Sequence, residues 1–251
     1  MWSPLEQFEI VVLKSFSFFG VLDLSVTNST IFLFFISFGI LFFGVMSFGT
    51  SRLIPSNYQL IFEQFYQFIF NMLIQQTGKQ GAAHFPIFFL TFFFILYSNF
   101  LGLFPFGFTV TGHLVITFAL AFSFNLSFFF LGFIEHGLSF LKLFKPSGAP
   151  KFLLPLIVVI EVLSYSLRSL SLSIRLFANM MAGHTLMFIL SSFVIGFIKN
   201  VSGLFSLFPV FFSIVVLLAV VFLEVGIAFL QAYVFVILLC IYLNDALHPG
   251  H

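Results

Sequence analysis

Charged residues are scarce in this sequence. Only 7% of its 251 residues are Asp, Glu, Lys or Arg, whereas about 25% are charged in a typical soluble domain. None occurs between Val26 and Ser51 or between Gln80 and Ile134, and a membrane-spanning helix needs only about 20 apolar residues. The sequence therefore excludes an ordinary soluble domain. It predicts an all-α integral membrane protein with one membrane domain over residues 1–251.

Other absences exclude several kinds of site. The single cysteine, Cys240, cannot form a disulfide within the chain, and we expect it to pack between helices. The net charge of +1 comes without a cluster of basic residues, so we expect no nucleic-acid partner. The histidines lack the spacing of a metal or haem site, and no glycine-rich phosphate loop occurs. We therefore expect no metal and no other cofactor.

Apolar runs divide the chain into predicted membrane segments. Residues 29–49 form the first span, which ends before Arg52 and Pro55. Residues 85–134 form a helical hairpin, with spans at 85–104 and at about 113–134. Residues 152–247 contain two long segments, 152–198 and 204–247, on either side of "KNVSG". We expect about five spanning helices in all.

Residues 56–78 differ from the apolar spans. Polar side chains recur there at every fourth position: Gln59, Glu63, Gln67, Asn71 and Gln75. This spacing places one polar stripe on a helix, which predicts an amphipathic helix in the membrane interface. The alternative is a helix inside the bundle whose polar stripe contacts a partner.

The two long segments exceed the thickness of a membrane. At about 1.5 Å per residue, a single helix over 152–198 would be about 70 Å long, against about 30 Å for the hydrocarbon core. The segment is therefore either steeply tilted or broken into two helices.

The basic residues set the predicted orientation, because loops on the cytoplasm-like side of a membrane collect Lys and Arg. If each long segment crosses once, Lys14 and Lys199 share one side, and the opposite side holds Arg52, Lys79, Lys142, Lys145 and Lys151. This excess predicts that the C-terminus lies on the basic side and the N-terminus on the other. If residues 152–198 crossed twice, the C-terminus would change sides.

A row of polar residues interrupts the first long segment. Glu161, Arg168 and Arg175 fall within about 40° on one helix face at about 100° per residue, and Asn179 lies one turn further. Arg175 cannot lose its proton, and an arginine at the bilayer centre costs at least about 2.5 to 3.5 kcal/mol. Some interaction must offset this cost.

Polar residues of the second long segment are expected to lie beside this row. Reflection of the numbering about a turn near residues 201 and 202 places Glu224 beside Asn179, between Arg175 and His184. Gln231 falls about one turn on the other side of Arg175. The predicted polar path runs through Glu161, Arg175, Glu224 and His184, in that order.

This set of side chains suits proton conduction. Glu and His can change protonation near neutral pH when they are buried, whereas Arg remains charged and blocks direct passage. The alternative is that Glu161, Arg168 and Arg175 only neutralise one another. One positive charge remains in excess in that set, so we expect a carboxylate from another chain. Carboxylates and hydroxyls do not cluster as a metal cage would, which favours protons over sodium.

The same residues carry a resemblance to a known family. The stretch "EVLSYSLRSLSLSIRLFANMMAGHTL" resembles the signature of subunit a of F-type ATP synthases. The stretches "GLFPFGFTVTGHLVITFALA", "LEVGIAFLQAYVFVILLCIYLNDA" and "SPLEQFEI" are similar to mitochondrial members of that family. The resemblance covers nearly the whole chain.

The resemblance implies a stationary subunit that performs no catalysis and has no catalytic residue. It implies two proton half-channels against a rotating ring of c subunits, with other membrane-sector and peripheral-stalk subunits as partners, in the mitochondrial inner membrane with the C-terminus on the matrix side. It also implies that the two long segments form a strongly tilted hairpin.

The resemblance assigns roles to individual residues as well. Arg175 would face the ring, attract each deprotonated carboxylate and stop proton leakage. The family's other proton-translocating positions are occupied here by Asn179, His184, Glu224, Gln231 and Glu161. Arg168 departs from relatives with an uncharged residue or lysine there, and it is a secondary candidate.

Two other functions fit the composition. A self-contained transporter could bind substrate at Glu224 and Arg175, but its expected inverted repeats are not seen in the sequence. A structural anchor in a respiratory complex would need none of the polar residues.

Overall fold

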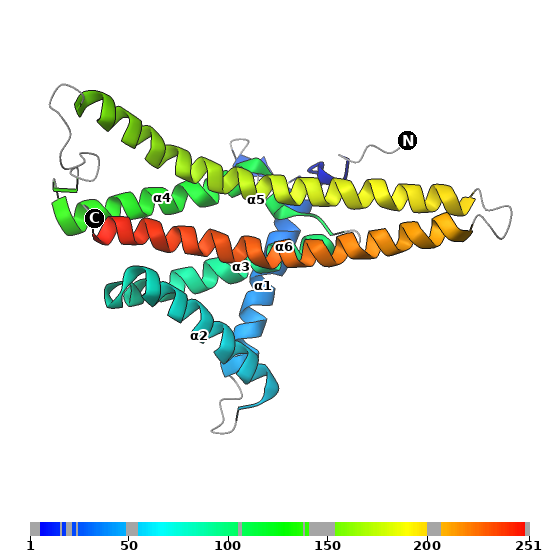
Figure 1. Ribbon diagram of the computed structural model, residues 1–251, viewed down its shortest axis with the longest axis horizontal. Coiled ribbons are helices and arrows are strands. Elements are labelled where there is room, and N and C mark those ends of the chain that lie inside the picture. Colours follow the sequence, from blue (N-terminus) through cyan, green and yellow to red (C-terminus); the bar gives the residue numbers. More distant parts are fainter. Residues whose placement is uncertain are drawn as a thin grey trace.

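Six α-helices make up most of the computed structural model, which describes residues 6–15, 17–18, 22–23, 25–48, 55–104, 107–137, 139–140, 154–199 and 207–248 (Figure 1). The helices are α1 (Asn28–Phe48), α2 (Asn57–Thr77), α3 (Phe85–Leu103), α4 (Leu114–His136), α5 (Leu154–Lys199) and α6 (Leu207–Leu247). Within these ranges, 5 helices are long and apolar enough to cross a membrane: α1, α3, α4, α5 and α6. The predicted all-α membrane fold is confirmed.

Short elements precede and connect the helices. Three 3-10 turns are η1 (Glu6–Phe8), η2 (Lys79–His84) and η3 (Val110–Gly112). Near the N-terminus, β1 (Val12–Lys14) pairs antiparallel with β4 (Val26–Thr27), and β2 (Ser17–Phe18) pairs with β3 (Leu22–Asp23). No element was predicted from the sequence before residue 29, so these strands were missed. They fold the N-terminal segment back to the start of α1.

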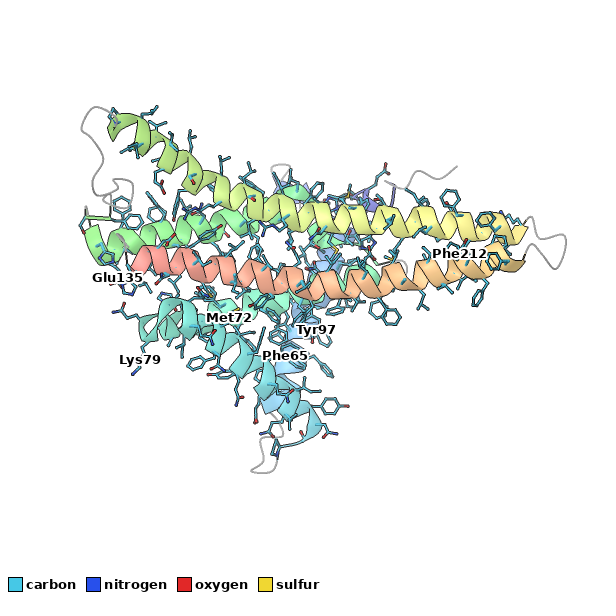
Figure 2. The ribbon with its side chains drawn as sticks, in the orientation of Figure 1. Phe65, Met72, Lys79, Tyr97, Glu135 and Phe212 are labelled. Atoms are coloured by element: carbon cyan, nitrogen blue, oxygen red, sulfur yellow. The ribbon has the colours of Figure 1, made fainter. Side chains whose placement is uncertain are left out.

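Helix α2 is amphipathic. It begins where the Ser56 hydroxyl accepts a hydrogen bond from the Gln59 amide, and it ends at Gly78, whose φ of 67° suits glycine. Its buried face packs on α1, α3 and α6, and Figure 2 shows Phe65 and Met72 on this side. The polar stripe at residues 59–75 lies on the outer face, half-buried at its start and exposed beyond it. Within the described chain, the stripe therefore does not pack inside the bundle.

Helices α5 and α6 are each one continuous helix. They contain 46 and 41 residues, and at about 1.5 Å per residue they are about 70 Å and about 60 Å long. The predicted alternative of a broken segment is wrong. The pair runs antiparallel along the longest axis, and α1 crosses it steeply (Figure 1). A helix about twice as long as the hydrocarbon core stays within it only when strongly tilted.

The C-terminal half of α6 is the centre of the core. Phe235, Leu239 and Leu243 are almost fully buried, at the spacing of one helix face. This half of α6 contacts α2, α3, α4 and α5. The N-terminal half instead exposes large apolar side chains such as Phe212 and Phe222. Residues near the middle of α6 therefore lie at the boundary between packed core and an exposed helix pair.

This burial pattern predicts unequal effects of two matched substitutions in α6. Phe235 is 0% exposed and Phe222 is 68% exposed. Phe235→Ala should lower the free energy of unfolding by about 3 kcal/mol, because it removes packing contacts and leaves a cavity. This cost remains in a membrane, where helices associate through packing. Phe222→Ala should change it by less than about 0.5 kcal/mol. Denaturation of the purified chain in detergent, followed by circular dichroism, measures both; equal losses would contradict the placement of the core.

Candidate functional site

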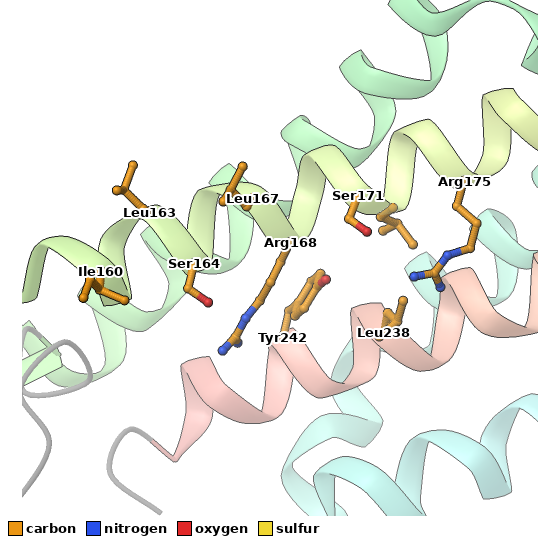
Figure 3. A pocket seen from close by; sticks show the side chains of 10 residues that line it. Ile160, Leu163, Ser164, Leu167, Arg168, Ser171, Arg175, Leu238 and Tyr242 are labelled. Carbon is orange, nitrogen blue, oxygen red and sulfur yellow. The ribbon is translucent and has the colours of Figure 1, made fainter. Parts of the chain in front are cut away.

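The predicted polar residues gather between α5 and α6. A groove of about 530 Å³ lies there, bordered by α5 from Ile160 to Arg175 and by Leu238 and Tyr242 of α6. Arg168 and Arg175 both extend from α5 toward α6 (Figure 3). The N-terminal part of α5 diverges from α6 (Figure 1), which leaves this groove open.

Arg168 is neutralised within the chain. Its Nη1 atom donates to Oδ2 of Asp245 at 3.0 Å, and its Nη2 atom lies 3.9 Å from Oε1 of Glu161. All three side chains are about one-third exposed. The mutual neutralisation that the sequence left open therefore holds for Arg168 and Glu161.

Asp245 was not predicted as part of the site. A signal was present, because Asp245 follows an apolar run of α6 in which Glu224 is the only other carboxylate. Its partner could not be predicted, since simple reflection of the numbering sets Arg168 more than a turn away from it. The long arginine side chain reaches Asp245 across the diverging helices.

Arg175 differs from Arg168 in its surroundings. Among the described residues of α5, both ion pairs involve Arg168, and no carboxylate in the described part of the chain lies within 4.0 Å of Arg175. Arg175 is exposed at one end of the groove, on the surface shared by α5 and α6. The positive charge predicted to be in excess is therefore the charge of Arg175.

A second cavity begins where the groove ends. It has a volume of about 200 Å³, and its α5 wall runs from Leu176 to Leu186. The α6 wall runs from Val220 to Gln231, and Leu103 of α3 completes the lining. Arg175 therefore stands between two hollows that follow the same helix pair in opposite directions.

Three of the predicted residues, Asn179, Glu224 and Gln231, line this second cavity, and His184 follows the lining residue Gly183 in the sequence. Asn179 and Gln231 are joined by a hydrogen bond, in which Nδ2 of Asn179 donates to Oε1 of Gln231 at 2.9 Å. Glu224 lines the cavity beside Gly183, where an added Cβ would overlap the carboxylate. His184 is the next residue of α5 and is buried. The structure thus brings Asn179, Gln231, Glu224 and His184 to one side of Arg175, and Glu161 and Arg168 to the other.

Several buried polar atoms in this region have no hydrogen-bond partner among the described residues: Thr109 Oγ1, His184 Nε2, Glu224 Oε2 and Gln231 Nε2. Buried polar atoms in folded proteins are almost always paired with protein or water. These atoms belong to α5, α6 and the segment before α4, and they supply donors and acceptors for bound water. The region therefore suits a chain of water molecules.

The predicted register of the two long helices was wrong by one to two turns. Glu224 lies beside Gly183 rather than Asn179, and Gln231, not Glu224, is the partner of Asn179. Part of the error, about three residues, comes from the position assumed for the turn. The midpoint between Lys199 and Leu207, where the helices end and begin, is residue 203, whereas the prediction placed the turn near 201 and 202. The order of Glu161, Arg175, Glu224 and His184 along the pair is unchanged.

Buried hydrogen bonds hold α3 and α4 against the site helices. Thr111 donates to Asn99, whose Nδ2 atom donates to the Ala228 carbonyl of α6 at 3.4 Å. Thr117 and Ser173 share a hydrogen bond of 3.1 Å between α4 and α5. Sequence reasoning did not single out these residues, although each is a polar side chain within an apolar run.

The remaining histidines of the described chain lie near helix ends. His136, at the end of α4, bonds through Nε2 to the Leu247 carbonyl at 2.8 Å. His113 precedes α4 and stacks on Phe108, with ring centroids 5.1 Å apart. Burial lowers the pKa of His113, because the charged imidazolium loses contact with water. This shift favours the uncharged imidazole of His113.

Comparison with known proteins identifies the family. The family model described as "ATP synthase A chain" matches residues 28–244. The chain belongs to this family. It is 45% identical to ATP synthase subunit a of Acanthamoeba castellanii over 252 residues, with 100% of each chain covered. It is 44% identical to subunit a of Pelagibacter ubique, with 99% of each chain covered, and 44% identical to that of Chondrus crispus, with 98% of this chain and 96% of the relative covered.

The predicted identity and general function are confirmed by this membership. The chain is a non-catalytic, proton-translocating membrane subunit of F-type ATP synthase. A self-contained transporter and a purely structural anchor are set aside. Arg175, which has no carboxylate partner among the described residues, and the second cavity are therefore features of a subunit that works within a larger complex.

The contact between Gly183 and Glu224 yields a matched pair of substitutions. A Cβ at Gly183 would lie 2.9 Å from Cδ of Glu224, whereas a Cβ at Gly226 meets no atom within 4 Å. Gly183→Ala should therefore displace the carboxylate and lower proton-driven ATP synthesis about 10-fold, since small displacements of a reacting group are costly. Gly226→Ala should retain synthesis within about 2-fold. Synthesis is measured per assembled complex in membrane vesicles, and an unchanged rate for Gly183→Ala would contradict the expected role of Glu224.

Proposed function

We propose that protons cross this subunit through two half-channels that meet at Arg175, and that their flow turns a ring of c subunits. The two cavities on opposite sides of Arg175 support this arrangement. The residues that line the two cavities include no titratable side chains that would connect one cavity with the other past Arg175. A proton that reaches this point must transfer to a group of another chain, and the ring carboxylates supply that group.

The charge of Arg175 is the observation that carries the proposal. Insertion of an arginine costs at least about 2.5 to 3.5 kcal/mol. A carboxylate at about 4 Å attracts it by about 4 kcal/mol at an effective dielectric constant of about 20. A ring carboxylate therefore offsets the cost while it is deprotonated, and the attraction is lost when it is protonated. Because Arg175 itself does not titrate, it holds the arriving anion without passing a proton.

Residues on each side of Arg175 have distinct proposed roles. In one half-channel, Glu224 and His184 exchange protons with bound water, and the Asn179–Gln231 hydrogen bond fixes the wall nearest Arg175. In the other half-channel, Glu161 exchanges protons, and Arg168 holds Glu161 and Asp245 in place. Arg168 thus supports a half-channel rather than attracting the ring.

The chain is a multi-pass membrane protein, and we place it in the mitochondrial inner membrane with the C-terminus on the matrix side. Relatives from Acanthamoeba castellanii and Chondrus crispus support a eukaryotic setting. The His136–Leu247 hydrogen bond puts the end of α4 beside the end of α6. The segment after α4 carries Lys142, Lys145 and Lys151, which like Arg52 lie outside the described residues. The C-terminus then shares a side with these basic residues.

The remaining segments take places consistent with this orientation. Residues 29–49 span the membrane, residues 56–78 lie in the interface with the polar stripe outward, and residues 85–134 form a helical hairpin. Residues 152–247 carry the proton path. The exposed apolar surfaces of α1, α5 and α6 are available for the ring, for other membrane-sector and peripheral-stalk subunits, and for lipid.

Substitution of Arg175 tests the proposal. Arg175→Ala removes the positive charge proposed to attract the ring carboxylate, so proton-driven ATP synthesis should fall below about 1% of the unsubstituted rate. Ser192→Ala is a suitable control, because Ser192 is an exposed residue of α5 whose hydroxyl bonds only to its own helix. Synthesis is measured in inverted membrane vesicles and normalised to assembled complex. Coupled synthesis at the unsubstituted rate in Arg175→Ala would refute the proposed role.

A further inference from the structure

One N-terminal side chain reaches into the site. Phe8, at the end of η1, is 9% exposed, whereas the residues that follow from Ile10 to Leu13 are each 53% to 59% exposed. Among the described residues 7–15, Phe8 is the only buried one. A buried aromatic ring in an otherwise exposed segment indicates a specific packing contact.

The contact is with His184. The rings of Phe8 and His184 lie 6.1 Å apart between centroids, with an angle of 88° between their planes. This is the edge-to-face arrangement that aromatic pairs prefer. The Phe8 ring also lies against η3, where a Cβ added to Gly112 would be 3.1 Å from it. Phe8 therefore fills the space between η3 and α5.

The backbone around Phe8 is fastened to the start of α1. Asn28 donates from Nδ2 to the Glu9 carbonyl at 3.0 Å and from its backbone amide to the Val11 carbonyl at 3.2 Å. The pairing of β1 with β4 continues this attachment. The attachment of this segment to α1 thus fixes the position of the Phe8 ring.

The other side of His184 faces α3 and the segment before α4. Its Nε2 atom would lie 3.4 Å from a Cβ added to Gly102, and the Thr109 side chain lies against the same glycine. Both His184 Nε2 and Thr109 Oγ1 are buried and unpaired in the described chain. Nε2 of the imidazole thus lies beside Gly102, where the carbon atoms of the Thr109 side chain also pack, and the Phe8 ring contacts the same imidazole.

We propose that Phe8 is a positioning residue for His184, which holds the imidazole so that Nε2 stays beside Gly102 of α3. This inference rests on the proposed proton-transfer role of His184. Phe8 has no group that can carry a proton, so it acts only through His184. A smaller side chain at residue 8 would leave the imidazole free to turn.

A double-mutant cycle tests this coupling in the assembled ATP synthase. Phe8→Ala and His184→Gln are each expected to lower proton-driven ATP synthesis about 10-fold per assembled complex, because a misplaced proton carrier is costly. If Phe8 acts through His184, the double variant should be no slower than the slower single variant. Phe8→Leu, which keeps most of the apolar volume, should restore the rate to within about 3-fold of the unsubstituted chain.

Ile10→Ala serves as the control in both backgrounds. Ile10 belongs to the same segment but is 53% exposed, so its substitution should change synthesis by less than about 2-fold. If Phe8→Ala reduces assembly, Phe8→Val takes its place in the cycle.

The outcomes separate this inference from the proposed function. An unchanged rate for Phe8→Ala, or losses that multiply to about 100-fold in the double variant, would show that Phe8 only fills space. An unchanged rate for His184→Gln would instead overturn the proton-transfer role of His184, whatever the effect of Phe8.

Discussion

The structure depends on one uncompensated charge placed between two long helices. Arg168 and Arg175 are seven residues apart on the same face of α5, yet only Arg168 has carboxylate partners among the described residues. A guanidinium in a membrane is stable only where an anion or water can reach it. The exposed position of Arg175 at the junction of two cavities leaves its charge accessible to an anion of another chain, and the proposed function rests on that access.

The position of this charge depends on how the α5–α6 pair is packed. The C-terminal half of α6 lies in the core formed with α2, α3, α4 and α5, which fixes α6 in the bundle. Asn99, Thr117 and their partners tie α3 and α4 to the same helices. Beyond Gln231 toward Leu207, α6 leaves this core. The cavity lined by Glu224, Asn179 and Gln231 forms at that transition, and the open groove forms where α5 diverges from α6.

Much of this arrangement was predictable from the sequence, because its signals are local. Charge-free runs gave the spans, and the spacing of polar residues in 56–78 gave an amphipathic helix. The seven-residue spacing placed Glu161, Arg168 and Arg175 on one face. Features that depend on three-dimensional geometry were missed. The register of α5 and α6 depends on where their connection begins and ends. The Arg168–Asp245 pair depends on the divergence of the two helices. The Phe8–His184 contact depends on the N-terminal segment folding back.

The central claim is that Arg175 is compensated by acid groups of a neighbouring chain. The most direct measurement is a cryo-electron microscopy map of the assembled ATP synthase that resolves the side chains around α5. The account predicts a carboxylate of a ring subunit facing the Arg175 guanidinium, with water on both sides along α5 and α6. A map in which Arg175 turns away from the ring and pairs with Glu224 or Asp245 of its own chain would contradict it.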